Sequence, residues 1–296
     1  MPRRRIGRVA LALAALLVAA RAARADDDLV ARGEYLTRAG GCFSCHTDAA
    51  HGGAALAGGR ALATPFGTFY SPNITPDRET GIGAWSETDF ARALRQGVRP
   101  DGANYFPVFP YPSFTKITND DARAIYAYLM ARPPVRRPDT PHAVAFPFSW
   151  RFLQVGWKLL FFTPGAFTPD RAHDATYNRG AYLVGALGHC AECHTPRNML
   201  GALERSRGLS GTPHGPDDQL VPNITPDRAT GIGDWTREDV ATLLETGRTP
   251  EDARVKGAMR EAVDDGLKYL TDADRDAIAG YLLAQPPVAN AVRPAK

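Results

Sequence analysis

Every cysteine of the chain lies in a short motif that occurs twice, at residues 42–46 and 190–194. Each copy reads Cys-x-x-Cys-His, a pattern typical of covalent attachment of a c-type haem. In such a site both thiols form thioethers with vinyl groups of the macrocycle, and the histidine binds the iron as a neutral imidazole. We therefore predict two covalently bound haem c groups. The predicted attachment and ligand residues are Cys42, Cys45 and His46 in the first motif, and Cys190, Cys193 and His194 in the second.

Two other uses of paired cysteines fit the sequence less well. A thioredoxin-like Cys-x-x-Cys needs no histidine after it and occurs beside a βαβ pattern, which this sequence lacks. A site with four cysteines around zinc has the right number of ligands. However, the two pairs begin 148 residues apart, whereas zinc motifs use short spacings. Two haems therefore remain the favoured interpretation.

The elements that must position these motifs are also duplicated. Residues 32–36 resemble 179–183, and the stretch Asn-Ile-Thr-Pro-Asp-Arg occurs at both 73–78 and 223–228. Each copy then continues to Thr-Gly-Ile-Gly-x-Trp, and each half closes on Pro-Pro-Val. The offset between matching segments stays between 147 and 153 residues, so the chain contains two copies of a unit of about 100 residues.

Each unit is predicted to be mainly α-helical. An amphipathic helix precedes each cysteine motif, and its glycine (Gly33 or Gly180) should allow close approach of the unit's last helix at Tyr128 or Tyr281. The other two helices should begin after a serine or threonine that has an aspartate three residues later. These predicted helix starts are Ser86 and Thr118 in the first unit, and Thr236 and Thr271 in the second. The repeated Asn-Ile-Thr-Pro-Asp segment is interpreted as a structural clasp, with polar groups that can face a haem propionate.

The N-terminal residues 1–25 have the features of a secretory signal peptide. A basic start precedes an apolar stretch from Val9 to Ala20, and Ala-Arg-Ala at 23–25 provides a cleavage pattern. Removal of this leader takes away six arginines and no acidic residue, which changes the formal net charge from +3 to −3. The basic excess therefore does not indicate nucleic-acid binding. Because no later stretch of about 20 apolar residues exists, no transmembrane helix is expected in the mature chain.

With these motifs the chain resembles the class I cytochrome c domains of multihaem cytochrome subunits that serve membrane-associated bacterial dehydrogenases. That group includes subunits of the alcohol, gluconate and sorbitol enzymes, and of the molybdenum-containing aldehyde and N-heterocycle enzymes. The resemblance covers most of residues 30–135 and 178–288, with motifs for two haems where relatives often have three. It implies an electron relay from the catalytic subunit of a dehydrogenase to quinone, another cytochrome or a terminal oxidase. A dihaem enzyme of the peroxidase type is the alternative.

The resemblance also implies a methionine as the sixth iron ligand, and here the two units differ. Met259 lies 65 residues after His194 and is predicted to bind the second haem iron. The corresponding count in the first unit reaches Phe109, which cannot bind iron, so the distal ligand of that haem stays undecided. The remaining candidates are Met130, expected in the core, and His51 and His142, both expected in surface loops.

The sequence therefore predicts an exported, periplasmic protein of mainly α class, with two tandem class I cytochrome c domains. The expected boundaries are a signal peptide at 1–25, a first domain at 26–135, a connector at 136–176, a second domain at 177–288 and a tail at 289–296. The aromatic-rich connector should contain a helix over 149–162. We expect this helix to pack between the two domains; an exposed patch that contacts a dehydrogenase or the outer face of the inner membrane is the alternative.

Overall fold

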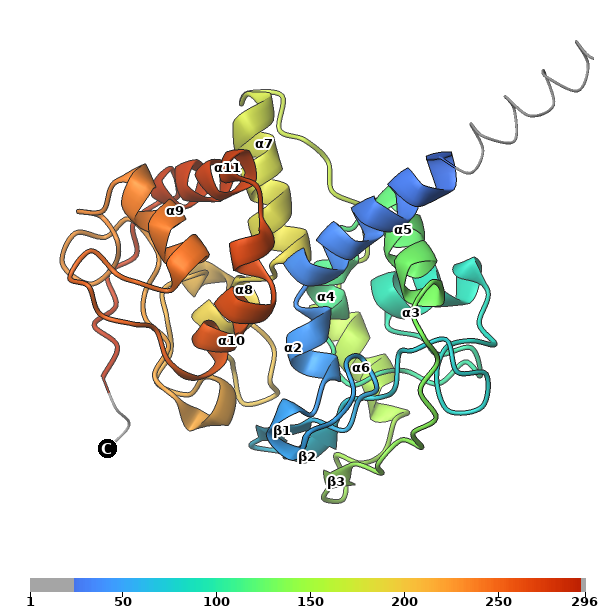
Figure 1. Ribbon diagram of the computed structural model, residues 1–296. Helices are drawn as coiled ribbons and strands as arrows, with labels where there is room; N and C mark the ends of the chain where they lie inside the picture. The colour runs from blue at the N-terminus through green and yellow to red at the C-terminus, as the bar shows by residue number, and fades with distance from the viewer. Residues whose placement is uncertain (1–23, 294–296) are drawn as a thin grey trace, which may run out of the picture.

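The computed structural model describes residues 24–293, so the predicted signal peptide lies almost entirely outside the described part. The described chain is mainly α-helical, with the first half and the second half side by side (Figure 1). A helix over residues 24–39 leads into the first cysteine motif. The helices that follow are α2 (Cys42–His46), α3 (Glu87–Gln96), α4 (Tyr111–Phe114), α5 (Asn119–Met130), α6 (Leu153–Phe161), α7 (Ala175–Tyr182), α8 (Ala191–His194), α9 (Arg237–Thr246), α10 (Gly257–Asp265) and α11 (Asp272–Leu283).

One small antiparallel sheet lies beside the first unit. It has the strand order β1-β2-β3, with β1 (Ala61–Thr64), β2 (Gly67–Tyr70) and β3 (Ala143–Val144). Ala61 pairs with Tyr70, and Thr68 pairs with Ala143. Because β3 belongs to the predicted connector, the sheet ties the connector to the first unit. The sequence analysis did not predict these strands.

The predicted helix starts are confirmed in both units. The side chains of Ser86, Thr118, Thr236 and Thr271 each accept a hydrogen bond from the backbone N–H of the aspartate three residues later. α3 and α9 end at Gly97 and Gly247, whose positive φ values of 62° and 72° suit a residue without Cβ. Local side-chain chemistry therefore sets these boundaries.

The close helix crossings predicted at Gly33 and Gly180 are also confirmed. A Cβ built on Gly33 would lie 1.9 Å from the carbonyl oxygen of Ala124 and 2.7 Å from Cβ of Tyr128. On Gly180 it would lie 2.0 Å from the carbonyl oxygen of Ala277 and 2.7 Å from Cβ of Tyr281. Any side chain at either glycine would push the two helices apart.

The repeated Asn-Ile-Thr-Pro-Asp segment holds the end of each unit. Asn73 donates from Nδ2 to the carbonyl oxygen of Val135 at 2.7 Å, and Asn223 donates in the same way to Val288 at 2.7 Å. Thr75 and Thr225 hydrogen-bond to the side chains of these asparagines at 2.8 and 2.7 Å. The segment is therefore a structural clasp, as predicted. Its asparagine amides bond to the main chain that follows the closing helices.

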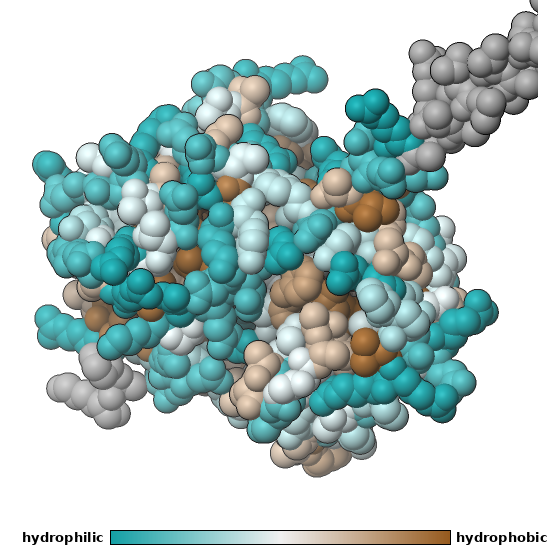
Figure 2. Space-filling model, viewed as in Figure 1, coloured by the Kyte–Doolittle hydropathy of each residue, from teal (hydrophilic) through white to brown (hydrophobic). Residues whose placement is uncertain are grey.

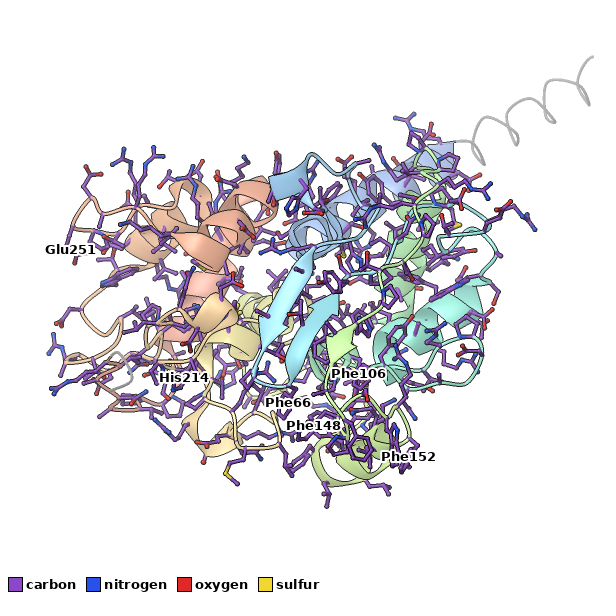
Figure 3. All side chains as sticks on the ribbon, turned by 90° about the horizontal axis from the view of Figure 1, so that it is seen from below. Phe66, Phe106, Phe148, Phe152, His214 and Glu251 are labelled. Carbon is purple, nitrogen blue, oxygen red and sulfur yellow. The ribbon has the colours of Figure 1, made fainter. Side chains whose placement is uncertain are left out.

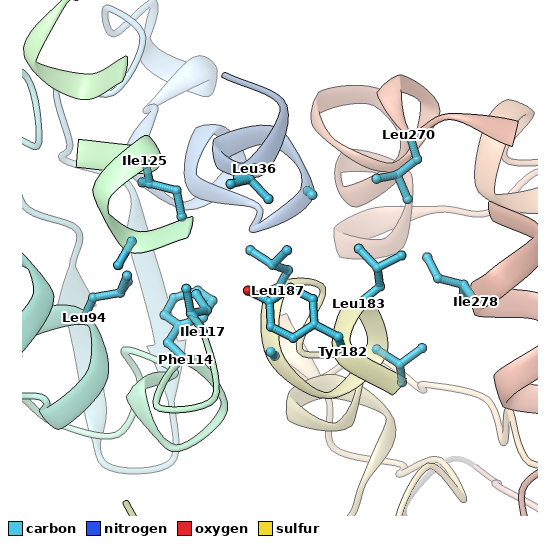
Figure 4. Packing of buried hydrophobic residues seen from close by; sticks show 14 of the residues in the cluster. Leu36, Leu94, Phe114, Ile117, Ile125, Tyr182, Leu183, Leu187, Leu270 and Ile278 are labelled. Carbon is cyan, nitrogen blue, oxygen red and sulfur yellow. The ribbon is translucent and has the colours of Figure 1, made fainter. Parts of the chain in front are cut away.

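The two halves share one hydrophobic core. Leu36, Leu183 and Leu187 lie between Ile125 of the first half and Ile278 of the second (Figure 4). This cluster takes in residues from both repeated units, so burial of apolar surface holds the halves together as well as stabilising each one.

Two reciprocal hydrogen bonds cross between the halves. The hydroxyl of Tyr35 donates to Asp274 of α11 at 2.5 Å, and the hydroxyl of Tyr182 donates to Asp121 of α5 at 2.5 Å. Within its own half, each aspartate also forms an ion pair with an arginine of the helix that precedes the cysteine motif. These ion pairs are Arg32–Asp121 and Arg179–Asp274, at 2.5 and 2.6 Å.

The connector helix is shorter and more exposed than predicted. α6 spans Leu153–Phe161 rather than 149–162, because residues 146–149 and 151–152 form turns. Its inner face touches both halves: Lys158 donates to the carbonyl oxygen of Gly97, and Trp157 donates to that of Leu200. Its outer face is not covered, so the expectation of a helix packed between the domains is only partly right. In the described part of the chain, no helix is long and apolar enough to cross a membrane.

Candidate haem sites

The two motif histidines have the same environment. Nδ1 of His46 lies 2.8 Å from the carbonyl oxygen of Pro72, and Nδ1 of His194 lies 2.8 Å from that of Pro222. Since a carbonyl oxygen can only accept, each Nδ1 carries the proton and each Nε2 keeps its lone pair. Burial lowers the pKa of both imidazoles, which favours this neutral form. Both rings are therefore prepared to bind a metal through Nε2.

The four cysteines are free thiols in the described structure, where none forms a disulfide. Burial raises the pKa of Cys42 and of Cys190 to about 12, and that of Cys193 to about 11. The pKa of Cys45 is also raised by burial. Protonated thiols of this kind do not suit a thiolate redox centre. Among residues 24–293, no group of three or more His, Cys, Asp and Glu side chains is arranged to hold a bare metal ion.

A cavity of about 510 Å³ lies beside the first motif, and Cys42, Cys45 and His46 are among its lining residues. Figure 2 shows apolar residues gathered near the centre of one face, whereas the periphery is mostly hydrophilic. A haem has a flat apolar macrocycle and two carboxylates, so it needs apolar walls and a few cations. The cavity offers both. Its lining includes Ile82, Phe90, Leu94, Ile125, Leu129, Arg99 and Arg151.

The cations of this cavity have different origins. Arg99 belongs to the first unit and pairs with Asp101 at 3.2 Å. Arg151 comes from the connector and donates to the carbonyl oxygen of Asn104 at 2.9 Å. These two guanidinium groups could hold propionates. No local sequence pattern marks Arg151 as a cavity residue, because its place depends on how the connector folds back onto the first unit.

The residues considered as distal ligands of the first haem differ in whether they line the cavity. Phe109 lines the cavity, and its ring centroid lies 5.8 Å from that of Phe114. Met130 is not among the lining residues of the cavity. His51 is outside it too, with an exposed side chain paired to Asp48, as expected for a surface loop.

His142 was also expected in a surface loop, and this expectation is only partly right. Its side chain is exposed on one side, yet it lines the cavity. Its Nδ1 accepts a hydrogen bond from the backbone N–H of Tyr70 at 3.2 Å. No methionine is among the residues that line this cavity in the described chain, so the structure provides no thioether opposite His46.

His189 is a cavity residue that the sequence analysis missed. It directly precedes the second motif, yet it lines the cavity of the first one, with its ring 5.3 Å from that of Phe114. Its buried Nδ1 has no hydrogen-bond partner among the described residues. His189 has φ +37°, and Gly41, which takes the same place in the first repeat, has φ +65°. Alignment of Gly-Gly-Cys with Gly-His-Cys across the repeats could have drawn attention to this histidine.

The two attachment segments touch each other at these residues. A Cβ built on Gly41 would lie 3.6 Å from Nε2 of His189. Ser113, beside the first cavity, donates to Glu192 of the second motif at 2.7 Å. Arg60, which directly precedes β1, pairs with Glu261 of α10. Each half therefore supplies residues that pack around the motif of the other half.

Met259 lies on α10 and is partly buried against the shared core. α10 packs against α9 of its own unit and against α2, which bears the first cysteine motif. Figure 1 shows α10 and α2 side by side at the centre of the molecule. Met259 is therefore partly sheltered from solvent, whereas Met199 is 94% exposed.

Comparison with known proteins decides the family. Residues 30–132 match the family model for cytochrome c. The chain is 41% identical to a dihaem c-type cytochrome of Cereibacter sphaeroides, over 95% of this chain and 96% of that protein. The chain belongs to the cytochrome c family. The family and the dihaem relative support two covalently bound haem c groups in this cytochrome.

Two longer relatives are cytochrome-containing subunits of dehydrogenases. The cytochrome is 42% identical to the fructose dehydrogenase cytochrome subunit of Gluconobacter japonicus, over 88% of this chain and 53% of that protein. It is 41% identical to the gluconate 2-dehydrogenase cytochrome c subunit of Pantoea cypripedii, over 93% of this chain and 64% of that protein. The chain thus spans about half the length of the first of these relatives and almost two thirds of the second.

Proposed function

We propose that this cytochrome is an exported, periplasmic electron carrier. It takes electrons from the catalytic subunit of a dehydrogenase and passes them to quinone, another cytochrome or a terminal oxidase. The observation that carries the proposal is the duplication of one histidine environment, with Nδ1 of His46 and of His194 each held at 2.8 Å by a proline carbonyl. The names of the fructose and gluconate dehydrogenase relatives support a dehydrogenase as the electron donor.

The site residues follow from this proposal. Haem c, when bound, supplies one-electron redox chemistry at its iron. The chain's own residues attach it, orient it and keep water away from it. Cys42 and Cys45 attach the first haem, with His46 as proximal ligand. In the second unit the corresponding residues are Cys190, Cys193 and His194, with Met259 as distal ligand.

We further propose that the two repeated units are tandem class I cytochrome c domains, at 26–135 and 177–288, with the aromatic connector at 136–176. Matching helix caps, glycine crossings and asparagine clasps support this division. The signal peptide at 1–25 and the tail at 289–296 complete the assignment. The shared core then keeps the two attachment segments in contact.

The cavity also bears on the alternative, a peroxidase-like enzyme. The sequence offered no acid–base residue near Phe109, but the structure places His142 and His189 on the same cavity. His189 has a pKa lowered by burial, and its ring packs against Phe114. His142 is held by the backbone of Tyr70. Both rings have structural neighbours, and the dihaem and dehydrogenase relatives favour the relay over the enzyme.

The number of electrons that each chain accepts and returns tests the proposed electron-carrier function. The mature holoprotein should accept two electrons per chain from dithionite under anaerobic conditions and return both to ferricyanide. Cys190→Ser/Cys193→Ser should halve this uptake, because one haem is no longer attached. Hydrogen peroxide should be consumed at a negligible rate. Sustained peroxide turnover would instead favour the enzyme, and an uptake of less than two electrons by the wild type would contradict two functional haems.

A further inference from the structure

The connector helix α6 turns polar side chains toward the protein and apolar side chains toward solvent. Gln154 is 9% exposed, and the ammonium of Lys158 donates to the carbonyl oxygen of Gln96 at 2.6 Å and to Oδ1 of Asn104 at 2.7 Å. In contrast, Leu159 is 83% exposed and Leu160 is 72% exposed. A surface helix normally turns its apolar stripe toward the core. Partial burial lowers the pKa of Lys158 to about 8, because desolvation disfavours the charged ammonium.

Neighbouring segments extend this outer face into one apolar patch. Phe66 of the β1–β2 turn packs on Phe148 with ring centroids 5.0 Å apart, and Trp157 donates to the carbonyl oxygen of Leu200 at 2.9 Å. Figure 3 shows Phe66, Phe148 and Phe152 at the same end of the molecule. We define the connector patch by its exposed members, Phe146, Phe148, Trp150, Phe152, Leu153, Val155, Leu159, Leu160, Met199 and Leu200.

The charge around the patch limits what can cover it. Between Asp139 and Asp170 the chain has no acidic residue, although the mature protein is acidic overall. The arginine and the lysine of this segment, Arg151 and Lys158, both hydrogen-bond to first-half residues. The connector part of the patch therefore presents apolar and aromatic side chains without acidic groups, which anionic lipid headgroups would repel.

We propose that the connector patch seats the protein on the surface of a lipid bilayer, with its apolar side chains inserted at the boundary between headgroups and acyl chains. Phenylalanine, tryptophan and leucine on an exposed face are typical of segments that lie in this interface. α6 has nine residues and is about 14 Å long, so it lies on a bilayer and does not cross it. The proposal does not depend on the electron-transfer role.

A lipid surface fits the patch better than a protein partner. Protein interfaces combine an apolar centre with a polar rim and about ten direct hydrogen bonds. The polar side chains of α6 are turned away from its outer face: Gln154 is buried, the indole N–H of Trp157 bonds to Leu200, and Lys158 bonds to the first half. The patch therefore has few groups left for hydrogen bonds to a protein, whereas insertion into a bilayer requires none.

Vesicle flotation of the mature holoprotein tests the proposal. The wild type should float with phosphatidylcholine vesicles, and with vesicles that also contain phosphatidylglycerol. Phe152→Ser/Leu159→Ser/Leu160→Ser should reduce the bound fraction at least about tenfold, because these side chains are exposed and insert. Binding should change by less than about threefold between low and high salt, since the patch cations are directed inward.

The matched control is Leu220→Ser/Tyr269→Ser, which removes two exposed apolar side chains outside the patch. This variant should float like the wild type, and both variants should keep the wild-type haem spectrum. A wild type that stays unbound with both vesicle types would overturn the proposal. So would equal losses in the two variants. A patch variant that instead changes the oligomeric state would assign the surface to a second copy of the chain.

Discussion

Replacing Met259 with leucine should double the carbon monoxide bound by the reduced protein, from one to two molecules per chain. In the proposed arrangement the second haem iron has His194 and Met259 as ligands and cannot accept a small ligand. Leucine has about the same volume but no sulfur donor, so it opens this position. The first site has Phe109 and no methionine among its lining residues, and therefore accounts for the one molecule bound by the wild type.

Titration of the dithionite-reduced protein with carbon monoxide, followed in the Soret band, measures this number. Met199→Leu is the matched control, because Met199 is 94% exposed and should leave the value at one. The oxidised wild type should also show one sulfur-to-iron charge-transfer band, which Met259→Leu removes. Two such bands in the wild type would refute the inequality of the sites and would restore Met130 as a ligand.

Asp274→Asn should lower the free energy of unfolding by about 3 kcal/mol at neutral pH, because it breaks a largely buried ion pair. The carboxylate of Asp274 accepts from Arg179 at 2.6 Å and, across the two halves, from Tyr35 at 2.5 Å. Asp276→Asn is the matched control on the same helix. Asp276 is about half exposed and pairs with Arg237 at 3.4 Å, so its loss should cost no more than about 0.5 kcal/mol.

The stability contributed by the Asp274–Arg179 ion pair should depend on pH. Burial would raise the pKa of Asp274, but the hydrogen bonds from Arg179 and Tyr35 outweigh it and hold the pKa below its usual value. A lowered pKa in the folded state contributes stability above the pKa of the unfolded chain, and this contribution is lost as pH falls through the folded-state pKa. The difference between wild type and Asp274→Asn, measured by denaturant unfolding of the holoprotein, should therefore shrink below about pH 4. A difference that is equal at pH 3 and pH 7 would contradict this explanation.

The sequence predicted the parts of the fold that depend on local chemistry. The caps at Ser86 and Thr271 follow from a hydroxyl and an aspartate three residues apart. In the structure, each hydroxyl accepts a hydrogen bond from the backbone N–H of that aspartate. The approach of Gly33 to Tyr128 was predicted because the repeat places both residues twice and a glycine without Cβ allows two helices to cross closely.

Features that depend on distant contacts were missed. The reversed orientation of α6 requires the carbonyl oxygens of Gln96 and Gly97, about 60 residues earlier in the chain, to receive Lys158. The place of His189 in the cavity of the other half depends on the packing of two attachment segments, which the order of residues does not reveal. The reciprocal Tyr–Asp bonds have the same origin. The sequence showed two units, but not which face of each one meets the other.

The most direct test of the central claim is the mass of the mature chain after acidic acetone extraction, which removes haem that is not covalently attached. We predict a mass equal to the mature polypeptide plus two haems for the wild type, and plus one haem for Cys42→Ser/Cys45→Ser. A wild-type chain that carries no covalent haem, or that binds zinc through its four cysteines, would contradict the proposed site and function.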